Sequence, residues 1–252
     1  MSEPLDSNVS QAAPTIPSRA QDFWERYFKF YDTLNNSIPY RRMIERHGEL
    51  LQAAEGDLIL DAGTGSGNVA VDLVSRKARV IGTDFCEPAL EICRRKVPEA
   101  QFQFGDLSKA QPFESNSFAK IACSCVLHVL DAEAQRTAVH EFFRILKPSG
   151  RLAITSFTTG FNPIKVYIET LRERRRIGGL GETLWFGLQH GINTVKIFYY
   201  VAQIQKGNRK GKHNFLSRDA MQRLLEGAGF KVESIESTFA GQCVTALATK
   251  PA

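Results

Sequence analysis

The chain has 252 residues, of which 43% are hydrophobic and 23% are charged, and its formal net charge is +5. This is an ordinary globular composition, and the length suits one large α/β domain with an insertion, whereas two full domains would be cramped. The modest excess of basic residues permits nucleic acid or anionic lipid as a partner, and it is also common among soluble enzymes.

The cysteines and the hydropathy pattern indicate a protein of a reducing compartment. Five cysteines are scattered along the chain, and none has the spacing of a zinc site. No apolar stretch near the N-terminus resembles a secretory signal, and no uninterrupted apolar stretch of 18 residues is present. We therefore expect a cytoplasmic protein without a membrane span and without a bound metal.

The first fifty residues divide into two parts. Residues 1–19 are rich in Ser, Pro and Ala and show no periodicity, which predicts a disordered tail. From Gln21 onward aromatic residues recur at helical spacing, so residues 20–50 are predicted to form a helical cap on a domain that spans 20–252. Such a cap either packs on the domain or closes over a ligand.

A glycine-rich turn follows the first predicted strand. The strand Leu58–Leu60 ends at Asp61, and Gly63, Gly65 and Gly67 precede a predicted helix. The spacing misses the pyrophosphate-binding pattern G-x-G-x-x-G, because Asn68 replaces the third glycine. Asp61 would repel phosphates but could orient an ammonium group, so a zwitterionic amino-acid ligand fits the turn better.

Two more acidic residues follow the next predicted strands. Asp84 ends the strand 78–84 and lies 19 residues after Gly65, close to the spacing at which a carboxylate binds ribose hydroxyls. Its alternative role is to cap the helix predicted at 87–97. Asp106 follows the short strand 101–104, and in isolation its Gly-Asp pair would be an ordinary turn.

The motif Asp61-x-Gly63-x-Gly65-x-Gly67 resembles the first motif of class I S-adenosylmethionine-dependent methyltransferases. The similarity extends over most of the chain from about residue 56. The segments 112–118 and 146–152 resemble later family motifs, although Ala119 stands where the family usually has Asp. The segment from Tyr31 to Asn35 resembles the N-terminal segment of the ubiquinone/menaquinone C-methyltransferase group.

The resemblance implies a fold and a cofactor site. The fold is a Rossmann-like, seven-stranded, mostly parallel sheet with helices on both faces, an antiparallel last strand and a helical insertion after strand five. Asp106 would accept a hydrogen bond from the adenine amine, and the backbone amide of Leu107 would meet a ring nitrogen. The implied S-adenosyl-L-methionine contacts are Asp61, Gly63, Thr64, Gly65, Gly67, Asp84, Phe85, Asp106, Leu107 and Ser124.

The residues that would contact the acceptor are less sharply defined. His128, just after the fourth strand, is the candidate general base, and it could equally be a structural histidine. Tyr31 and Tyr40 of the cap and His190 of the insertion are candidate substrate contacts. The segment from Ser124 to Leu127 lacks the Asn/Asp-Pro-Pro-aromatic turn of enzymes that methylate base amines, which argues against a nucleic-acid substrate.

Residues 160–215 form the predicted insertion. The part from Thr183 to Ile204 is aromatic and almost uncharged, and basic residues follow it at Lys206, Arg209, Lys210 and Lys212. An apolar lid beside basic clusters suits an anionic membrane surface or a lipidic or phosphorylated substrate. A solvated basic face next to a buried helix would have the same pattern.

The sequence therefore predicts a methyltransferase with a hydrophobic small-molecule acceptor, such as a quinol, a phenol or a lipid-like compound. The first alternative is N-methylation of a phospholipid headgroup or another amine. A second is a cofactor-binding module without catalysis, and the weakest is a nicotinamide-dependent oxidoreductase. Peripheral membrane contact is a further expectation, and the sequence indicates no oligomeric state.

Overall fold

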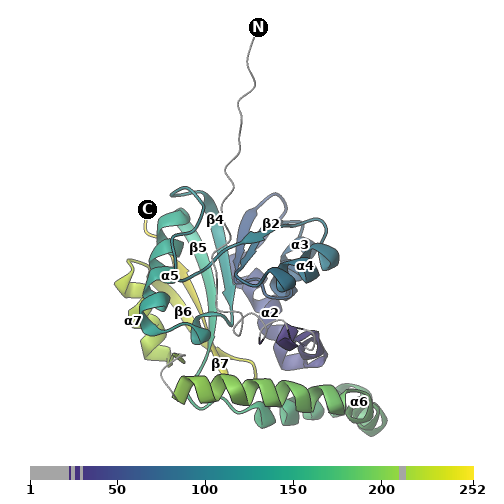
Figure 1. Ribbon diagram of the computed structural model, residues 1–252. Helices are drawn as coiled ribbons and strands as arrows, with labels where there is room; N and C mark the ends of the chain where they lie inside the picture. The colour runs from purple at the N-terminus through teal and green to yellow at the C-terminus, as the bar shows by residue number, and fades with distance from the viewer. Residues whose placement is uncertain (1–22, 24–25, 29–30, 210–213) are drawn as a thin grey trace.

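A seven-stranded sheet organises the described residues, which in this computed structural model are 23, 26–28, 31–209 and 214–252. The strands lie in the order β3-β2-β1-β4-β5-β7-β6 (Figure 1). They are β1 (Leu58–Ala62), β2 (Arg79–Asp84), β3 (Gln101–Phe104), β4 (Phe118–Ser124), β5 (Leu146–Phe157), β6 (Lys231–Thr238) and β7 (Cys243–Thr249). Only β7 pairs antiparallel with its neighbours within this sheet, which confirms the predicted fold class.

The strand order places a binding crevice between β1 and β4. From β1 the chain proceeds through β2 to β3 on one side, and β4 begins the other side of the sheet. Loops that leave the carboxyl ends of β1 and β4 therefore diverge, which opens a crevice there. Both strands are largely buried because helices cover the two faces of the sheet.

The helices form a layer on each face of the sheet (Figure 1). They are η1 (Asp32–Asn36), α2 (Ile38–Leu51), α3 (Asn68–Ser75), α4 (Glu87–Lys96), η2 (Leu127–Val129), α5 (Ala132–Ile145), α6 (Pro163–Arg209) and α7 (Arg218–Gly227). Buried residues of α2, α3 and α4 share one hydrophobic cluster, and those of α5 and α7 share another. The sheet therefore has two cores, one on each face.

Two helices begin with residues of the types that prefer the N-cap position. The Asp131 carboxylate accepts hydrogen bonds from the amides of Glu133 and Ala134 at 3.0 and 2.9 Å, which caps α5. The Ser217 hydroxyl accepts one from the amide of Ala220 at 3.2 Å, which caps α7. Each side chain satisfies amides that lack a partner within the helix.

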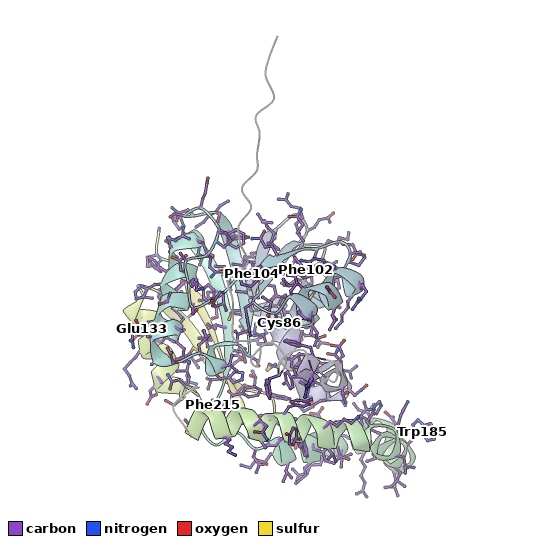
Figure 2. All side chains as sticks on the ribbon, viewed as in Figure 1. Cys86, Phe102, Phe104, Glu133, Trp185 and Phe215 are labelled. Carbon is purple, nitrogen blue, oxygen red and sulfur yellow. The ribbon has the colours of Figure 1, made fainter. Side chains whose placement is uncertain are left out.

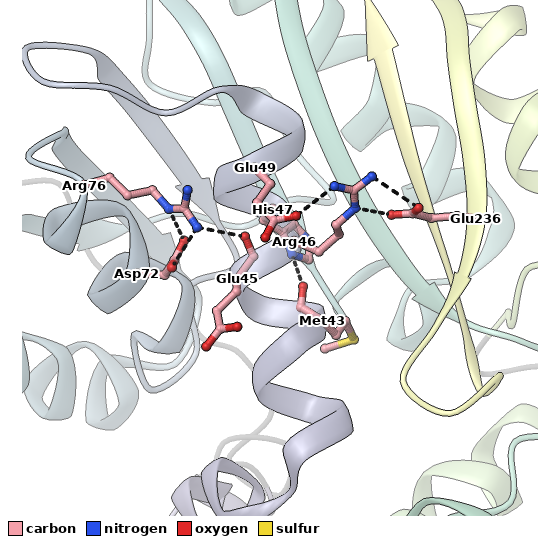
Figure 3. A network of polar contacts seen from close by, with 8 residues as sticks. All are labelled: Met43, Glu45, Arg46, His47, Glu49, Asp72, Arg76 and Glu236. Atoms are coloured by element: carbon pink, nitrogen blue, oxygen red, sulfur yellow. Dashed lines mark hydrogen bonds and ion pairs between the residues drawn. The ribbon is translucent and has the colours of Figure 1, made fainter. Parts of the chain in front are cut away.

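Helix α2 is tied to both neighbouring layers by arginine contacts (Figure 3). Arg46 of α2 donates to Glu236 of β6 at 2.6 Å and to Glu49 at 2.8 Å. Arg76, just after α3, donates to the backbone oxygen of Glu45 at 3.2 Å. These contacts fix the helix between α3 and the far edge of the sheet, although exposed pairs add little stability individually.

His47 anchors the buried side of α2 to β5. Its Nδ1 lies 2.9 Å from the Met43 oxygen, which can only accept, so Nδ1 carries the proton and Nε2 accepts from the Thr155 hydroxyl at 3.0 Å. Burial lowers the pKa of His47 to about 4. The imidazole is therefore neutral at physiological pH and serves as a structural hydrogen-bond bridge.

Several boundaries differ from the sequence prediction. The aromatic helical pattern that begins at Gln21 does not run unbroken to Tyr40, because Ser37 is extended (φ −85°, ψ 117°) between η1 and α2. Strand β5 begins at Leu146, directly after α5 and at the start of the segment 146–152 that resembles a family motif, because Leu146 pairs with Phe118 of β4. The predicted disordered tail, residues 1–19, lies outside the described residues.

The predicted insertion contains α6, which crosses the end of the domain and extends beyond it (Figure 1). Gly179 has a non-helical backbone (φ 76°, ψ −168°), so α6 consists of two helical segments joined by a kink. A positive φ of this size is accessible to glycine without a Cβ clash. Among the described residues, every helix falls short of the length and hydropathy that crossing a bilayer would require.

Candidate functional site

The glycine turn after β1 requires glycine at each of its three positions. Gly63, Gly65 and Gly67 have φ values of 73°, 55° and 79°, in the left-handed region. A Cβ on Gly63 would overlap the side chain of Val126. Gly67 occupies the N-cap position of α3, so the turn leads directly into that helix.

Asp84, at the end of β2, holds the turn in place. Its Oδ2 accepts a hydrogen bond from the amide of Gly65 at 2.9 Å, and its Oδ1 accepts one from the amide of Cys86, also at 2.9 Å. Burial raises the pKa of Asp84 to about 6, although these amides partly oppose the shift. The carboxylate is therefore mostly ionised near neutral pH but incompletely compensated.

Asp61, at the end of β1, is the more strongly perturbed of the two acids. It is 1% exposed, and its Oδ2 accepts a hydrogen bond from the Thr64 hydroxyl at 2.7 Å. Burial is the main cause that raises its pKa to about 7, and the nearby charge of Asp84 adds to the shift. A cationic group beside Asp61 would offset both effects.

These residues line one cavity, which we call the strand-tip cavity. Its empty volume is about 770 Å³, including open solvent at its mouth. The strand ends and their loops contribute Asp61, Gly65, Asp84, Phe85, Ser124 and His128 to its walls. The Ser124 hydroxyl is buried and has no hydrogen-bond partner within the described part of the chain, which leaves it available to a ligand.

The cap closes the cavity from the N-terminal side. Phe28 packs so closely on the turn that a Cβ on Gly65 would lie 3.1 Å from its ring. Tyr27 and Tyr31 complete this aromatic wall, with ring centroids 5.1 Å apart. The wall is apolar and water-excluding, as a reaction with a reactive electrophile requires.

Polar contacts hold the cap against the glycine turn. Asp32 accepts hydrogen bonds from Lys96 at 3.0 Å and from the Ser66 hydroxyl at 2.7 Å. Asn68, where the pyrophosphate pattern would have glycine, accepts from Lys96 at 2.6 Å and from Asn35 at 3.0 Å. The substituted position therefore fastens the cap.

Tyr31 and Tyr40, predicted to contact the substrate, line the strand-tip cavity. Asn68 donates to the Tyr40 hydroxyl at 3.2 Å, and Tyr40 donates to the Tyr31 hydroxyl at 3.1 Å. Burial raises the pKa of both phenols above the ordinary value of 10. They therefore remain protonated at neutral pH, and neither can serve as a general base.

Not all predicted site residues reach the cavity. Asp106 forms a turn in which its Oδ1 accepts from the Ser108 amide at 3.0 Å and from the Ser108 hydroxyl at 2.7 Å. Leu107 is buried in the core on the α5 side of the sheet. Neither residue, nor Gly67, is among those lining the strand-tip cavity.

His190 lies on α6 and is not among the residues that line the strand-tip cavity. Its ring packs on Phe186, with centroids 4.9 Å apart, and its Nδ1 lies 3.5 Å from the Asn36 amide nitrogen. His128, by contrast, lines the strand-tip cavity, is 2% exposed, and packs edge-on against Phe157 at 4.5 Å.

A second cavity, which we call the apolar cavity, lies between the cap and α6. Its empty volume is about 600 Å³, including open solvent. Its walls include Phe161, Val166, Phe186, Phe198, Val201 and Phe239. Tyr27, Leu34 and Phe157 line both cavities, so the two are adjacent.

Sequence reasoning missed several residues of these walls. Phe157 is the last residue of the fifth strand, where it looks like an ordinary apolar residue, and Phe28 is not among the candidate residues of the cap. Lys96 is the last residue of a helix, where a basic side chain interacts favourably with the helix dipole, so its presence there indicates no further function. Only Asn68 carried a signal, because it replaces a glycine at a motif position.

The parallel sheet, the crevice beyond its strand ends and the two buried acids define a protein that binds a nucleoside carrying an amino-acid group. The residues fit S-adenosylmethionine: Asp61 would face its ammonium group, Asp84 its ribose hydroxyls, and the aromatic wall would exclude water. The incompletely compensated charge of both acids agrees with a ligand that supplies a cation and hydroxyl donors.

Comparisons with known proteins identify the family. Residues 59–150 match the model of a methyltransferase domain. The ubiquinone/menaquinone biosynthesis C-methyltransferase UbiE of Syntrophotalea carbinolica is 30% identical over 171 residues, which span 62% of this chain and 70% of that protein. The demethylmenaquinone methyltransferase of Lactococcus lactis is 26% identical over 247 residues, which span 92% and 90% of the two chains.

A solved structure shows the same fold at low sequence identity. It is a TehB-like S-adenosylmethionine-dependent methyltransferase from Corynebacterium glutamicum, 19% identical, with a TM-score of 0.58. The similarity covers 93% of this chain and all of that one. The chain belongs to the class I S-adenosylmethionine-dependent methyltransferases.

Proposed function

We propose that this methyltransferase methylates a ring carbon of a hydrophobic small molecule, a quinol or phenol with an apolar substituent. The observation that carries the proposal is the apolar cavity, which adjoins the strand-tip cavity through Tyr27, Leu34 and Phe157. The two quinone C-methyltransferases to which the chain is similar support this choice of acceptor.

The apolar cavity suits an acceptor without charge. Three of its hydroxyls already have partners: those of Ser37 and Thr170 lie 2.9 Å apart, Thr170 lies 2.9 Å from the Val166 oxygen, and Thr194 donates to the His190 oxygen at 2.9 Å. A charged headgroup would lose its hydration there without finding a counter-charge. The acceptor's apolar substituent would occupy this cavity, with its ring toward Phe157.

When bound, S-adenosylmethionine supplies a methyl group on a positively charged sulfur, which is already a strong electrophile. The chain's own residues therefore have to hold the acceptor in line, exclude water and accept a proton. Phe28, Tyr27 and Tyr31 close the strand-tip cavity against solvent. Their contribution is positional, since burial raises the pKa of the Tyr27 and Tyr31 phenols above the ordinary value of 10, so both stay protonated at neutral pH.

His128 is the residue that we propose as the base. It lines the strand-tip cavity and packs on Phe157, which also lines the apolar cavity. An acceptor ring at Phe157 would therefore lie beside the imidazole. Removal of a hydroxyl proton by His128 would increase the electron density of the ring carbon that attacks.

A cavity-filling substitution tests the acceptor site. Val166, 7% exposed, lines the apolar cavity, and Ile164 of the same helix is 57% exposed. We expect Val166→Phe to raise the KM for a prenylated quinol or to abolish its turnover, because the added ring occupies the acceptor's space. Affinity for S-adenosylhomocysteine, measured by isothermal titration, should stay within about twofold, since the strand-tip cavity is untouched.

The matched control is Ile164→Phe, which should leave both quantities unchanged. Because overpacking costs about 1–3 kcal/mol, thermal unfolding of each variant is measured beside the assay. The acceptor panel includes a reduced prenylated quinone, a simple phenol and phosphatidylethanolamine, and mass spectrometry locates the added methyl group. Turnover of the amine alone, or equal activity of a folded Val166→Phe variant, would refute the proposal.

A further inference from the structure

The outer side of α6 carries an apolar stripe, which we define as Leu180, Leu184, Leu188, Val195 and Tyr199. These residues follow one another at spacings of three to four residues or multiples of them, so they share a helical face about 100° wide. Their exposed fractions are 59%, 61%, 81%, 67% and 61% in that order. The stripe therefore faces solvent from Leu180 to Tyr199 in the second segment of α6.

The exposed apolar side chains are concentrated on this helix. Of the eleven large hydrophobic residues exposed within the described part of the chain, nine belong to α6, and only Val71 and Phe104 lie elsewhere. Trp185, 66% exposed, projects at the outer end of the helix, away from the domain (Figure 2). An exposed apolar surface of this extent marks an interaction site.

Basic charge accompanies the stripe. Residues 160–215 contain ten basic and three acidic residues, a net charge of +7, whereas the remainder has 22 basic and 24 acidic residues, a net charge of −2. Exposed Arg175 and Arg176 precede the kink, and exposed Lys206 falls on the same helical face as the stripe. The positive charge of the chain thus belongs to the insertion.

We propose that the outer face of α6 docks the protein on an anionic lipid bilayer. The exposed leucines and Trp185 would enter the headgroup region, while the arginines and lysines contact anionic headgroups. A second copy of the chain is a poorer occupant, because a symmetric contact would bring two faces of net positive charge together.

The stripe lies on the same helix as walls of the apolar cavity, which is the acceptor site if the proposed function holds. Phe186 lies on the opposite side of the same helical segment and lines the apolar cavity, together with Phe198 and Val201 of that segment. A bilayer against the stripe would therefore lie one helix away from the acceptor site. This arrangement suits an acceptor that is dissolved in the membrane.

Vesicle cosedimentation of the full chain tests the docking. We use vesicles of phosphatidylcholine with and without phosphatidylglycerol, without any acceptor. The protein should bind the anionic vesicles, and binding should weaken at high salt because the attraction is screened. The double variant Leu184→Asp/Leu188→Asp should lower the partition coefficient by about tenfold or more, since it removes apolar area and adds repulsion.

The matched control is Val71→Asp, which changes an exposed apolar residue of α3 (42% exposed) and should leave vesicle binding unchanged. Titration with S-adenosylhomocysteine confirms that each variant is folded. No binding of the wild type to anionic vesicles, or equal binding by the folded double variant, would overturn the docking. The docking would also be overturned if light scattering showed that the wild type is a dimer, that the double variant is not, and that neither binds vesicles.

The outcomes separate the two proposals. Vesicle binding together with no turnover of any hydrophobic acceptor would refute the proposed function and leave the docking intact. Turnover of a short-chain quinol in solution without vesicle binding would do the reverse. The double variant should retain that solution turnover, because neither leucine lines a cavity.

Discussion

Replacement of Asp84 by alanine should separate cofactor affinity from stability. The carboxylate would accept two hydrogen bonds from ribose hydroxyls, each contributing about 1.5 kcal/mol when the acceptor is charged. Their loss amounts to about 3 kcal/mol, or about 150-fold in the dissociation constant. Isothermal titration with S-adenosylhomocysteine at pH 8, where Asp84 is ionised, measures this change directly.

The stability of the same variant should change little, because two effects oppose each other. Asp84 has a folded-state pKa of about 6 against an ordinary 3.8. Because the pKa is raised in the folded state, Asp84 favours folding most below pH 3.8, its pKa in the unfolded chain. This contribution to stability is lost as the pH rises through 6, so ionised Asp84 costs about 3 kcal/mol of folding free energy at pH 8. Alanine removes this cost, which already includes the two amide-to-carboxylate hydrogen bonds, but it leaves the amides of Gly65 and Cys86 without an acceptor, at about 1–3 kcal/mol each.

The thermal midpoint of Asp84→Ala should therefore remain within about 4 °C of the wild type. Asp72→Ala is the control, because Asp72 is a half-buried acid of α3 that pairs with Arg76 outside the cavity. It should leave the dissociation constant within about twofold. If a folded Asp84→Ala variant binds S-adenosylhomocysteine with a dissociation constant less than about fivefold above that of the wild type, the assignment of Asp84 to the ribose hydroxyls is refuted.

Two further predictions follow from the same contacts. Burial raises the pKa of Asp61 to about 7 and of Asp84 to about 6. The ligand binds the ionised acids, so its dissociation constant should rise as the pH falls below these values, by up to about tenfold per pH unit for each acid. A dissociation constant that stays the same from pH 8 to pH 5 would contradict this. Lys96→Met should loosen the cap by removing the contact with Asp32, which speeds cofactor release several-fold and raises hydrogen exchange in residues 31–36. Lys77→Met, on an exposed pair, is its control, and unchanged release from a folded Lys96→Met would show that the ion pair does not hold the cap.

The sequence predicted the sheet and the strand-tip acids for a physical reason. In a parallel sheet all carboxyl ends point to one edge, so acids that end successive strands must converge there. Asp61 and Asp84 do so, and both line the cavity beside the glycine turn. The caps at Asp131 and Ser217 were equally predictable, because a cap depends on amides within three residues along the chain.

Asp106 shows where this reasoning reaches its limit. It also follows a strand of the sheet, but Oδ1 of its carboxylate accepts hydrogen bonds from Ser108, two residues later, and Asp106 is not among the residues that line the strand-tip cavity. Strand position predicts the edge of the sheet at which a side chain lies. The local turn decides whether the side chain reaches the ligand.

By itself, the sequence determined the helices and strands and their caps, because periodicity and turn chemistry act over short distances along the chain. It also determined the convergence of two acids, because the carboxyl ends of parallel strands lie at one edge of the sheet. Only the tertiary structure decided which surfaces meet. The packing of Phe28 on Gly65, the junction of the two cavities at Phe157 and the placement of His190 outside the strand-tip cavity depend on contacts between segments far apart in the chain. An apolar residue is attracted to any apolar partner, so its hydropathy alone does not specify which one it contacts.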